Sequence, residues 1–319
     1  MPAAVASGWS AFERPLCDNS RMQKRCIVGL SLFLVARPLL AIDLAPDDLI
    51  PPKSGLRYVQ VGFTHSERED YKLKGATTAP GVGMRGAIGH LRYGQTFEWA
   101  GQPAVAYAQV AQGEIRPTGW PASVTAERST GDLSLFLGRW LLADRLASRY
   151  AAVGGYLVLP TGSYALEKTT GFNRNLGENR VRAALQVGYH QPLSSTWGWM
   201  TAADVLWSSQ NDAIYNASGV RGTLDQAPLY SLQTAIGRSI AEHVRLGFSY
   251  FYTQGGETRF NGVDQNNALR VHRGMLTLTT HGLGGRWMLQ VGRDIKTDTG
   301  FVEKERVILR YTTRLPDAH

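Results

Sequence analysis

Cysteine is almost absent from this chain, which has two cysteines in 319 residues. Both of them, Cys17 and Cys26, lie near the N-terminus. If the chain matures near Ile42, no cysteine remains, and the fold must close by hydrogen bonding and packing without disulfides. This absence argues against the disulfide-stapled class of secreted domain, and β-barrels of the cell envelope satisfy the same condition.

The segment before Ala41 has the pattern of a signal peptide. A basic stretch over 22–25 precedes a short apolar run over 26–36. This run is about half the length that a membrane-spanning helix needs, so we expect a cleaved signal peptide rather than an anchor. Residues 1–21 show no strong periodicity and suggest an upstream start codon or an unusual leader. We therefore treat 1–41 as leader and exclude it from the fold.

A strong excess of one charge is also lacking. The formal net charge is +8, and removal of the leader takes away five basic and two acidic residues, which leaves about +5. The basic residues are scattered through the chain rather than clustered on one stripe. This pattern argues against a nucleic-acid partner and favours positions in a lumen or in loops.

Long hydrophobic runs are absent after residue 42, and hydropathy predicts no helical membrane span there. A membrane protein is not excluded, because barrel strands hide their apolar face in alternation. Alternation with a period of two is the dominant pattern of the chain. Over 306–315, apolar or aromatic side chains at most odd positions interleave with arginines at three even positions. The runs over 181–190 and 244–253 alternate in the same way.

These runs predict twelve strands joined by connections that alternate between long and short. The expected strands cover approximately 55–65, 82–97, 103–114, 130–143, 148–160, 179–192, 197–210, 227–239, 243–256, 268–280, 285–297 and 302–315. The expected long connections are 66–81, 115–129, 161–178, 211–226 and 257–267. The intervening turns fall near Gly101, Asp144, Ser194, Ala241 and Gly282.

An antiparallel up-and-down transmembrane β-barrel predicts this order of connections, with short turns on the periplasmic side and longer external loops. A spanning sheet must close, because hydrocarbon cannot satisfy unpaired strand edges. We therefore expect an all-β fold of about twelve strands in the outer membrane of a bacterial cell. The expected organisation is a short periplasmic N-terminal segment at 42–54 and a single barrel domain at 55–319. Twelve strands enclose more space than eight, which predicts a water-filled or partly plugged lumen.

Polar side chains at alternate positions are expected to face the lumen. The candidates are Arg182, Gln186, His190, Arg245, Gln290, Arg310 and Arg314. The four arginines of this set could form a selectivity ladder for anionic solutes. Alternatively, lumenal arginines pair with acids or remain hydrated, and only their proximity in space separates these cases. On the outer face, Trp197, Trp199, Trp287 and Tyr311 are expected to lie in interfacial aromatic girdles.

Motifs for chemistry are weak or absent. Residues 81–86 match G-x-G-x-x-G, but the match follows a turn and enters a strand, so a dinucleotide site is not expected. The histidines show no metal-ligand spacing. None is followed by serine two positions later, and no G-x-S-x-G elbow is present, which weighs against a membrane-embedded esterase. We expect no catalytic residue, no metal and no cofactor.

The stretch LPTGSY, residues 159–164, ends one expected strand. Proline cannot donate a ladder hydrogen bond and glycine permits unusual dihedral angles, so this stretch is expected to act as an external-loop hinge. The expected hinge residues are Pro160, Thr161, Gly162, Ser163, Tyr164, Asn179 and Arg180. Together with the segment 175–180 and Gly131-Asp132-Leu133, the stretch resembles a family of outer-membrane transporters linked to the meta-cleavage pathway of phenol degradation. Ala165 and Val181 depart from the family pattern.

The resemblance implies an envelope barrel with a role in the uptake of aromatic or other poorly soluble compounds. The sequence therefore favours a passive outer-membrane channel for small molecules, whose partners are the lipid bilayer and a small solute. The alternatives are a receptor, adhesin or structural barrel that acts through its long loops, a membrane esterase, and a soluble secreted β protein. Loop deletion separates a receptor from a channel, because binding would be lost while permeability remained.

Overall fold

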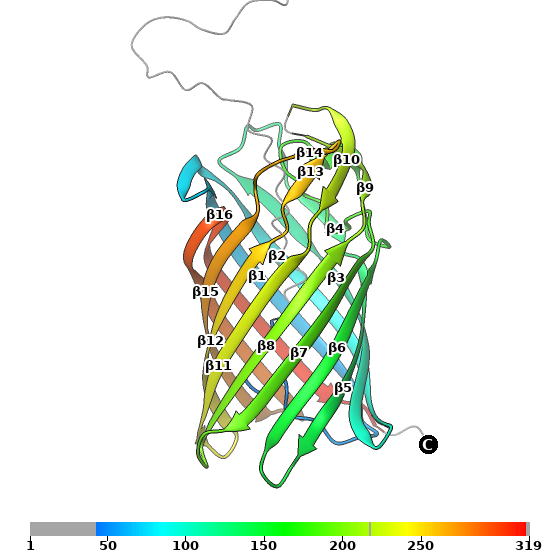
Figure 1. Cartoon of the computed structure of the whole chain (residues 1–319), viewed down its shortest axis with the longest axis vertical. Helices are drawn as coiled ribbons and strands as arrows, with labels where there is room; N and C mark the ends of the chain where they lie inside the picture. The colour runs from blue at the N-terminus through cyan, green and yellow to red at the C-terminus, as the bar shows by residue number, and fades with distance from the viewer. Residues whose placement is uncertain (1–42, 217, 317–319) are drawn as a thin grey trace, which may run out of the picture. The chain divides into compact units, whose positions relative to one another are not determined.

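The alternating runs of the sequence form the strands of one antiparallel sheet that closes on itself (Figure 1). The computed structural model describes residues 43–216 and 218–316, so the predicted leader lies outside the described residues. The strands of this sheet are β1 (Arg57–Leu73), β2 (Ala76–Trp99), β3 (Gln102–Thr118), β4 (Glu127–Thr130), β5 (Leu133–Asp144), β6 (Arg149–Leu159), β7 (Arg182–Pro192), β8 (Trp197–Ser208), β11 (Leu229–Ala241), β12 (Val244–Gly255), β15 (Leu269–Gly282) and β16 (Gly285–Arg314). Every neighbouring pair is antiparallel, and β2 pairs with both β1 and β3, which closes the wall.

The long element β16 crosses the wall twice. Its first half, 285–299, pairs with β15, and its second half, 300–314, pairs with β1. The two halves lie side by side, because the rings of Trp287 and Tyr311 are 4.5 Å apart. The backbone N–H of Glu303 also donates to Asp294 at 2.9 Å. Eleven elements therefore close the wall with twelve crossings, and β4 pairs outside this ring with β3 alone. The expected all-β antiparallel barrel is confirmed, and each expected run falls on one of these crossings.

The connections differ from the sequence expectation in detail. The connection expected at 66–81 is mostly strand, because β1 and β2 continue as a hairpin to a tight turn at Lys74 and Gly75. The strands continue to pair there with polar side chains, as in the ion pair of Arg85 with Glu67. The alternation of apolar residues therefore ends in the sequence before the strands end in the structure.

A second sheet lies at the long-loop end of the barrel (Figure 1). Its strands are β9 (Asn211–Tyr215), β10 (Arg221–Gln226), β13 (Thr258–Phe260) and β14 (Val263–Asp264). Ile214, Leu224 and Phe260 form its buried apolar cluster. The expected loops 211–226 and 257–267 are thus partly strand, because their apolar residues pack against each other. The connection 161–178 carries the short 3₁₀ helix η2 (Leu166–Thr169).

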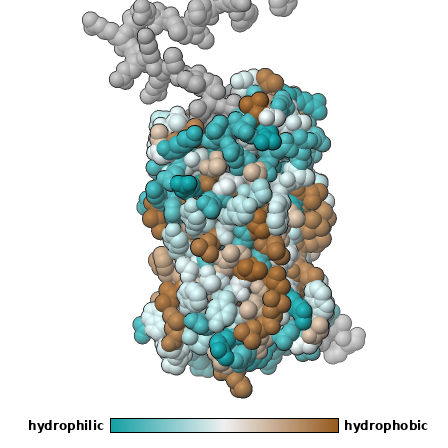
Figure 2. Space-filling model, in the orientation of Figure 1, coloured by the Kyte–Doolittle hydropathy of each residue, from teal (hydrophilic) through white to brown (hydrophobic). Residues whose placement is uncertain are grey.

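The outer face of the wall is apolar. Aliphatic and aromatic side chains meet across neighbouring strands, as in the aligned pairs of Phe63 with Leu309 and Phe248 with Leu276. These four side chains are 41–65% exposed. Figure 2 shows such hydrophobic surface along the sides of the barrel below a more hydrophilic long-loop end. Within the described residues, no helix has the length and apolar character needed to cross a bilayer.

The inner face carries the polar partners of this alternation. On β7, Arg182, Gln186 and His190 are buried, whereas Leu185 and Val187 between them are exposed to the outside. The barrel interior therefore holds many buried polar groups together with a few apolar clusters. This interior positions the candidate site.

Candidate functional site

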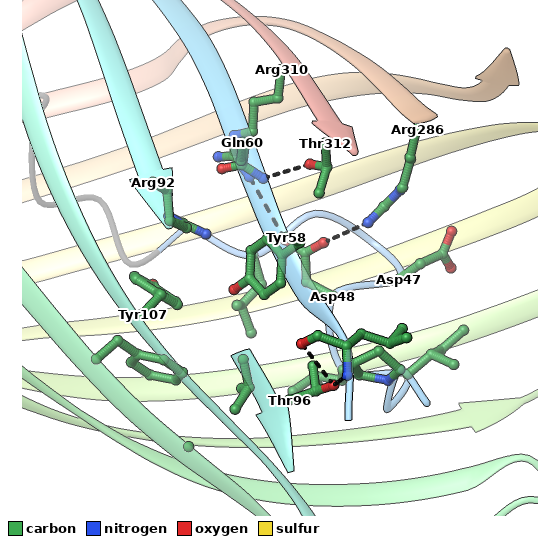
Figure 3. Close-up of a pocket in the computed structure, with 18 of the residues that line it drawn as sticks. Asp47, Asp48, Tyr58, Gln60, Arg92, Thr96, Tyr107, Arg286, Arg310 and Thr312 are labelled. Atoms are coloured by element: carbon green, nitrogen blue, oxygen red, sulfur yellow. Dashed lines mark hydrogen bonds and ion pairs between the residues drawn. The ribbon is translucent and has the colours of Figure 1, made fainter. Parts of the chain in front are cut away.

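A cavity of about 920 Å³ occupies the part of the lumen next to the short turns. Its wall is formed by β1, β2, β3, β5, β6, β7, β15 and both halves of β16. Figure 3 shows side chains from these strands pointing into the space from several directions, among them Arg92, Tyr107, Arg286 and Arg310. The cavity is mixed in character, with tyrosines and aliphatic groups beside arginines, glutamines and threonines.

One side of the cavity is formed by residues 43–52, which we call the inner segment. The sequence suggested a short periplasmic segment at 42–54, whereas the structure places residues of the inner segment against the inner wall of the barrel. Ala45 and Leu49 are buried among inward-facing residues of the strands. The indole N–H of Trp140 donates to the carbonyl of Leu49 at 2.7 Å, and the Gln233 amide bonds the backbone of Leu44. The chain therefore narrows its own lumen.

Three aspartates of the inner segment bind arginines of the wall. Asp47 lies 3.0 Å from Arg245. Asp48 lies 3.3 Å from Arg286 and 3.7 Å from Arg310. The third, Asp43, lies within 3.6 Å of two further arginines, Arg273 and Arg306. Five cations on the wall thus share three carboxylates on the segment, which fixes its position electrostatically. Ion pairs shielded from bulk water are weakened less by salt than exposed ones.

The wall also makes room for the inner segment with glycine. A methyl group built on Gly247 would lie 2.5 Å from Cγ of Pro46, and one on Gly188 would lie 2.8 Å from both terminal carbons of Leu49. These distances are shorter than atoms tolerate. Both glycines occupy inward positions of their strands, where alternation elsewhere puts a larger side chain. The small size of Gly247 is therefore a requirement of the docked segment, because the Pro46 ring is rigid, whereas a methyl group on Gly188 would require the end of the Leu49 side chain to shift.

Nearer the long-loop end, Asp43 joins a buried ion network. Its members come from β1, β15 and β16 as well as from the inner segment, and they are Asp43, Arg68, Arg273, Asp294, Glu303 and Arg306. Glu303 is the centre, because it lies within 3.0 Å of three arginines. Three cations meet three carboxylates, so the network is neutral only while Asp43 is present.

The predicted lumen-facing residues do not form one site. Gln186, Arg310 and Arg314 line the cavity. Gln290 is fully buried and donates to Thr277 at 3.0 Å, and His190 is buried with its ring 5.7 Å from that of Tyr150. Three of the four arginines of the suggested ladder pair with acids, since Arg182 lies 2.5 Å from Glu178 and the other two bind the inner segment. Arg182, Arg245 and Arg310 therefore follow the alternative in which lumenal arginines pair with acids.

The LPTGSY stretch follows directly after β6, which ends at Leu159. Asp132 holds it from the start of the neighbouring strand, because its carboxylate accepts the backbone N–H of Gly162 at 2.9 Å and that of Glu178 at 2.8 Å. Thr161 accepts the N–H of Leu133, and Ser163 bonds Thr130. The LPTGSY stretch and residues 175–180, which we call the return segment, are thus both bound by the Asp132 carboxylate.

The return segment is anchored on the other side by Asn211 of β9. Its amide donates to the hydroxyl of Tyr164 at 3.0 Å and to the carbonyl of Glu178 at 2.9 Å. Its side-chain oxygen accepts a hydrogen bond from Asn179, whose backbone has a positive φ of 55°. Arg180 is buried beside Glu178 and bonds Gln226. Pro160 is the first residue after β6. The expected hinge residues therefore form a fastened loop at the long-loop end, and the structure gives them no contact with the cavity.

Sequence reasoning missed the inner segment, Arg92, Arg286 and the tyrosines of the cavity. A signal was present for the segment: Asp43, Asp47 and Asp48 precede the first strand, while inward positions of later strands are rich in arginine. Acidic residues that precede the first strand of a barrel with a basic inner face indicate that the N-terminal segment binds that face. The aromatic groups gave no such signal, because aromatic residues favour strands in general.

The comparisons identify similar proteins. The family model described as "Putative MetA-pathway of phenol degradation" matches residues 50–302. The COG4313 outer membrane channel from Pseudomonas putida F1 is 22% identical, with a TM-score of 0.78, and the match covers 86% of this chain and 100% of that chain. The TodX deltaS2S3 mutant monoaromatic hydrocarbon channel is 8% identical, with a TM-score of 0.50 and coverage of 83% and 91%. The beta domain of the Bordetella autotransporter BrkA is 14% identical, with a TM-score of 0.50 and coverage of 82% and 100%. No curated protein matches this chain.

Proposed function

The chain belongs to the family described as "Putative MetA-pathway of phenol degradation", and from this membership and its fold we propose that it is an outer-membrane channel for the passive uptake of small molecules. The resemblance seen in LPTGSY and its neighbouring motifs is thereby confirmed. The family's link to phenol degradation supports aromatic or hydrophobic solutes as the class that is carried. We propose no reaction, and the chain acts by selection rather than by chemistry.

The observation that carries the proposal is a closed wall that is apolar outside and surrounds a cavity lined by both basic and aromatic side chains. Exposed side chains such as Phe63, Leu276 and Leu309 lie on strands across the wall. A water-soluble monomer rarely exposes so much contiguous apolar surface, whereas a bilayer covers it favourably. The cavity of about 920 Å³ has the size of a small-molecule site.

The position of the aromatic residues supports the same setting. Trp99 and Trp197 lie beside short turns, and Trp287 packs on Tyr311 next to another. Arg238 lies 5.3 Å from the centre of the Trp197 ring. Amphipathic rings beside basic groups are favoured where hydrocarbon meets headgroups. We place the short-turn end at the periplasmic interface of the outer membrane.

In this proposal the inner segment sets the permeability, because it occupies space that a solute would otherwise cross. The test is conductance in planar bilayers of the purified, folded protein and of a variant that lacks residues 43–50. The intact protein is expected to give small, discrete conductance steps, and the deletion is expected to raise the step size several-fold. Heat-modifiable migration in detergent gels verifies that both proteins are folded barrels.

The proposal fails if neither folded protein conducts ions or admits small solutes to proteoliposomes. A deletion that leaves the conductance step unchanged would instead show that the inner segment does not limit the path. Other solved barrels of similar shape are named as channels, among them the monoaromatic hydrocarbon channel, which supports the proposal by analogy of fold.

A further inference from the structure

The wall of the cavity is basic, and its counter-charges come from elsewhere. Five arginines line the space, from β2, β5 and β16, namely Arg92, Arg139, Arg286, Arg310 and Arg314. The acids that line it are the three aspartates of the inner segment. Of these, Asp43 and Asp47 pair with arginines that do not line the cavity, and Asp48 alone is shared by Arg286 and Arg310. The cavity therefore has an excess of positive charge.

Beside these charges, three aromatic rings form one apolar surface, which we call the aromatic shelf. It consists of Tyr107 on β3, Phe136 on β5 and Tyr156 on β6. The rings of Tyr107 and Phe136 are stacked with centres 4.7 Å apart, and those of Phe136 and Tyr156 are 4.4 Å apart. The hydroxyls of Tyr107 and Tyr156 are hydrogen-bonded at 3.1 Å. The shelf is thus a preassembled aromatic part of the cavity wall.

Arg92 joins the shelf to the basic wall. Its guanidinium lies 3.9 Å from the centre of the Tyr107 ring, and it donates through Nε and Nη2 to the Gln109 amide oxygen at 3.1 and 2.8 Å. Both contacts are to neutral groups, and they hold the planar cation in a fixed orientation. Figure 3 shows the side chains of Arg92 and Arg310 near Gln60, and all three residues line the cavity. Two like charges that face one space favour an anion between them.

We propose that the cavity binds aromatic carboxylates, with the ring against the aromatic shelf and the carboxylate between Arg92 and Arg310. This inference rests on the proposed channel function and names the class of solute that the channel selects. Arg92 supplies charge-assisted hydrogen bonds, which are stronger than neutral ones. An aliphatic acid of equal charge has no aromatic ring to place against the shelf, so it binds more weakly. Neutral aromatic alcohols lose the contact with the arginines.

Titration calorimetry of the detergent-purified full chain tests this with three probes: benzoate, benzyl alcohol and cyclohexanecarboxylate. Benzoate is expected to bind most tightly. In Arg92→Gln its affinity is expected to fall roughly ten-fold or more, because one charged hydrogen-bonding partner is lost. Arg92→Lys keeps the charge without the planar fork and is expected to give an intermediate loss. Benzyl alcohol affinity is expected to stay the same in both variants.

The matched control is Arg85→Gln on the same strand, since Arg85 points outward and pairs with Glu67 on the surface. It is expected to leave benzoate affinity unchanged. Arg310→Gln gives an independent test of the same site. The inference is overturned if benzoate binds no better than both other probes, or if Arg92→Gln and Arg310→Gln match Arg85→Gln. Bilayer conductance of the same preparations tests the channel function separately from the aromatic-carboxylate site. A protein that conducts but does not prefer benzoate would support the channel function and overturn only the aromatic-carboxylate site.

Discussion

At the scale of single residues, the free space in the lumen depends on individual contacts between the wall and the inner segment. Asp48 is the most connected of the three aspartates, because it lies near both Arg286 and Arg310 and also caps its own turn by accepting the Ala45 N–H at 2.8 Å. Gly247 matters for the opposite reason, since it offers empty space where Pro46 lies. Charge and shape therefore hold the segment together.

Asp48→Asn is expected to loosen the inner segment. The substitution removes the shared counter-charge of Arg286 and Arg310, and an unpaired group in a partly buried site costs about 1–3 kcal/mol. We expect longer or larger open states in single-channel recordings, with an unchanged gel shift of the folded barrel. Asp212→Asn is the control, because Asp212 is exposed on β9, away from the cavity. Recordings of Asp48→Asn that match this control would refute the role of Asp48.

Gly247→Ala is expected to displace the inner segment by shape alone. The added methyl group would lie 2.5 Å from Cγ of the rigid Pro46 ring, and overpacking of this kind costs about 1–3 kcal/mol. The measurement is the same single-channel conductance, which should rise. Gly155→Ala is the matched control, since its methyl group would meet only the Ala184 carbonyl at 3.8 Å. Equal conductance of the two alanine variants would contradict the expected clash.

At the scale of elements, strands continue wherever pairing is possible and loops form where a side chain fastens the backbone. The β1–β2 hairpin shows the first case, and the segment after Leu159 shows the second. In that segment, Asp132 and Asn211 bind backbone groups from two sides. The family motif is therefore a fastening device whose role in the fold is local.

Asp132→Ala is expected to release the loop 161–181 without opening the barrel. Two backbone N–H groups, of Gly162 and Glu178, lose their acceptor, at a cost of about 1–3 kcal/mol each. Limited proteolysis should cut this loop faster, whereas the heat-modifiable gel shift should remain. Asp132→Asn keeps one acceptor oxygen and should lie between the wild type and alanine. A loop that resists protease equally in all three proteins would rule out the fastening role.

The short turn between β5 and β6 gives a prediction for pH. The N–H of Ala147 donates to Asp144 at 2.9 Å, and this bond, followed by the ion pair with Arg149, lowers the pKa of the Asp144 carboxyl below its ordinary value of 3.8. The bond thus stabilises the turn at pH values above 3.8, and this contribution is lost as the pH falls through the lower pKa of the folded state. Carboxyl NMR titration should give a midpoint below 3.8.

Arg149→Gln serves as the comparison for this titration. It should move the Asp144 midpoint only part of the way back, because the Ala147 hydrogen bond remains. A midpoint at or above the ordinary value in the unchanged protein would contradict the prediction.

At the scale of the whole molecule, closure of the sheet does what disulfides do elsewhere. Every strand of the wall has two neighbours, so residues 43–316, which include no cysteine, leave no long open edge in the wall. Closure also creates an inner space, and the arginines on its wall need acidic groups to balance their charge. The inner segment supplies these acids from the same chain, which makes the barrel and its partial plug one unit.

Alternation was sufficient to predict the wall. The arginines at 306, 310 and 314 lie at even positions, and Val307, Leu309 and Tyr311 lie at odd ones, and this pattern alone assigns the two faces of the last crossing. The expected end of the strand before LPTGSY also agrees with β6, which ends at Leu159. Period-two patterning carries this information because successive side chains of a strand point to opposite faces.

The contents of the lumen could not be predicted in the same way. Asp43 and Arg306, for example, are 263 residues apart in sequence, and their Oδ2 and Nη1 atoms lie 3.4 Å apart only because the barrel closes. The same holds for the aromatic shelf, which gathers one ring from each of three strands. The sequence by itself determined a closed, apolar-faced barrel, since local alternation specifies which side each residue takes. Only the tertiary structure decided that the N-terminal segment enters the lumen and leaves a basic, aromatic cavity beside it, because contacts across a closed lumen have no period in the sequence.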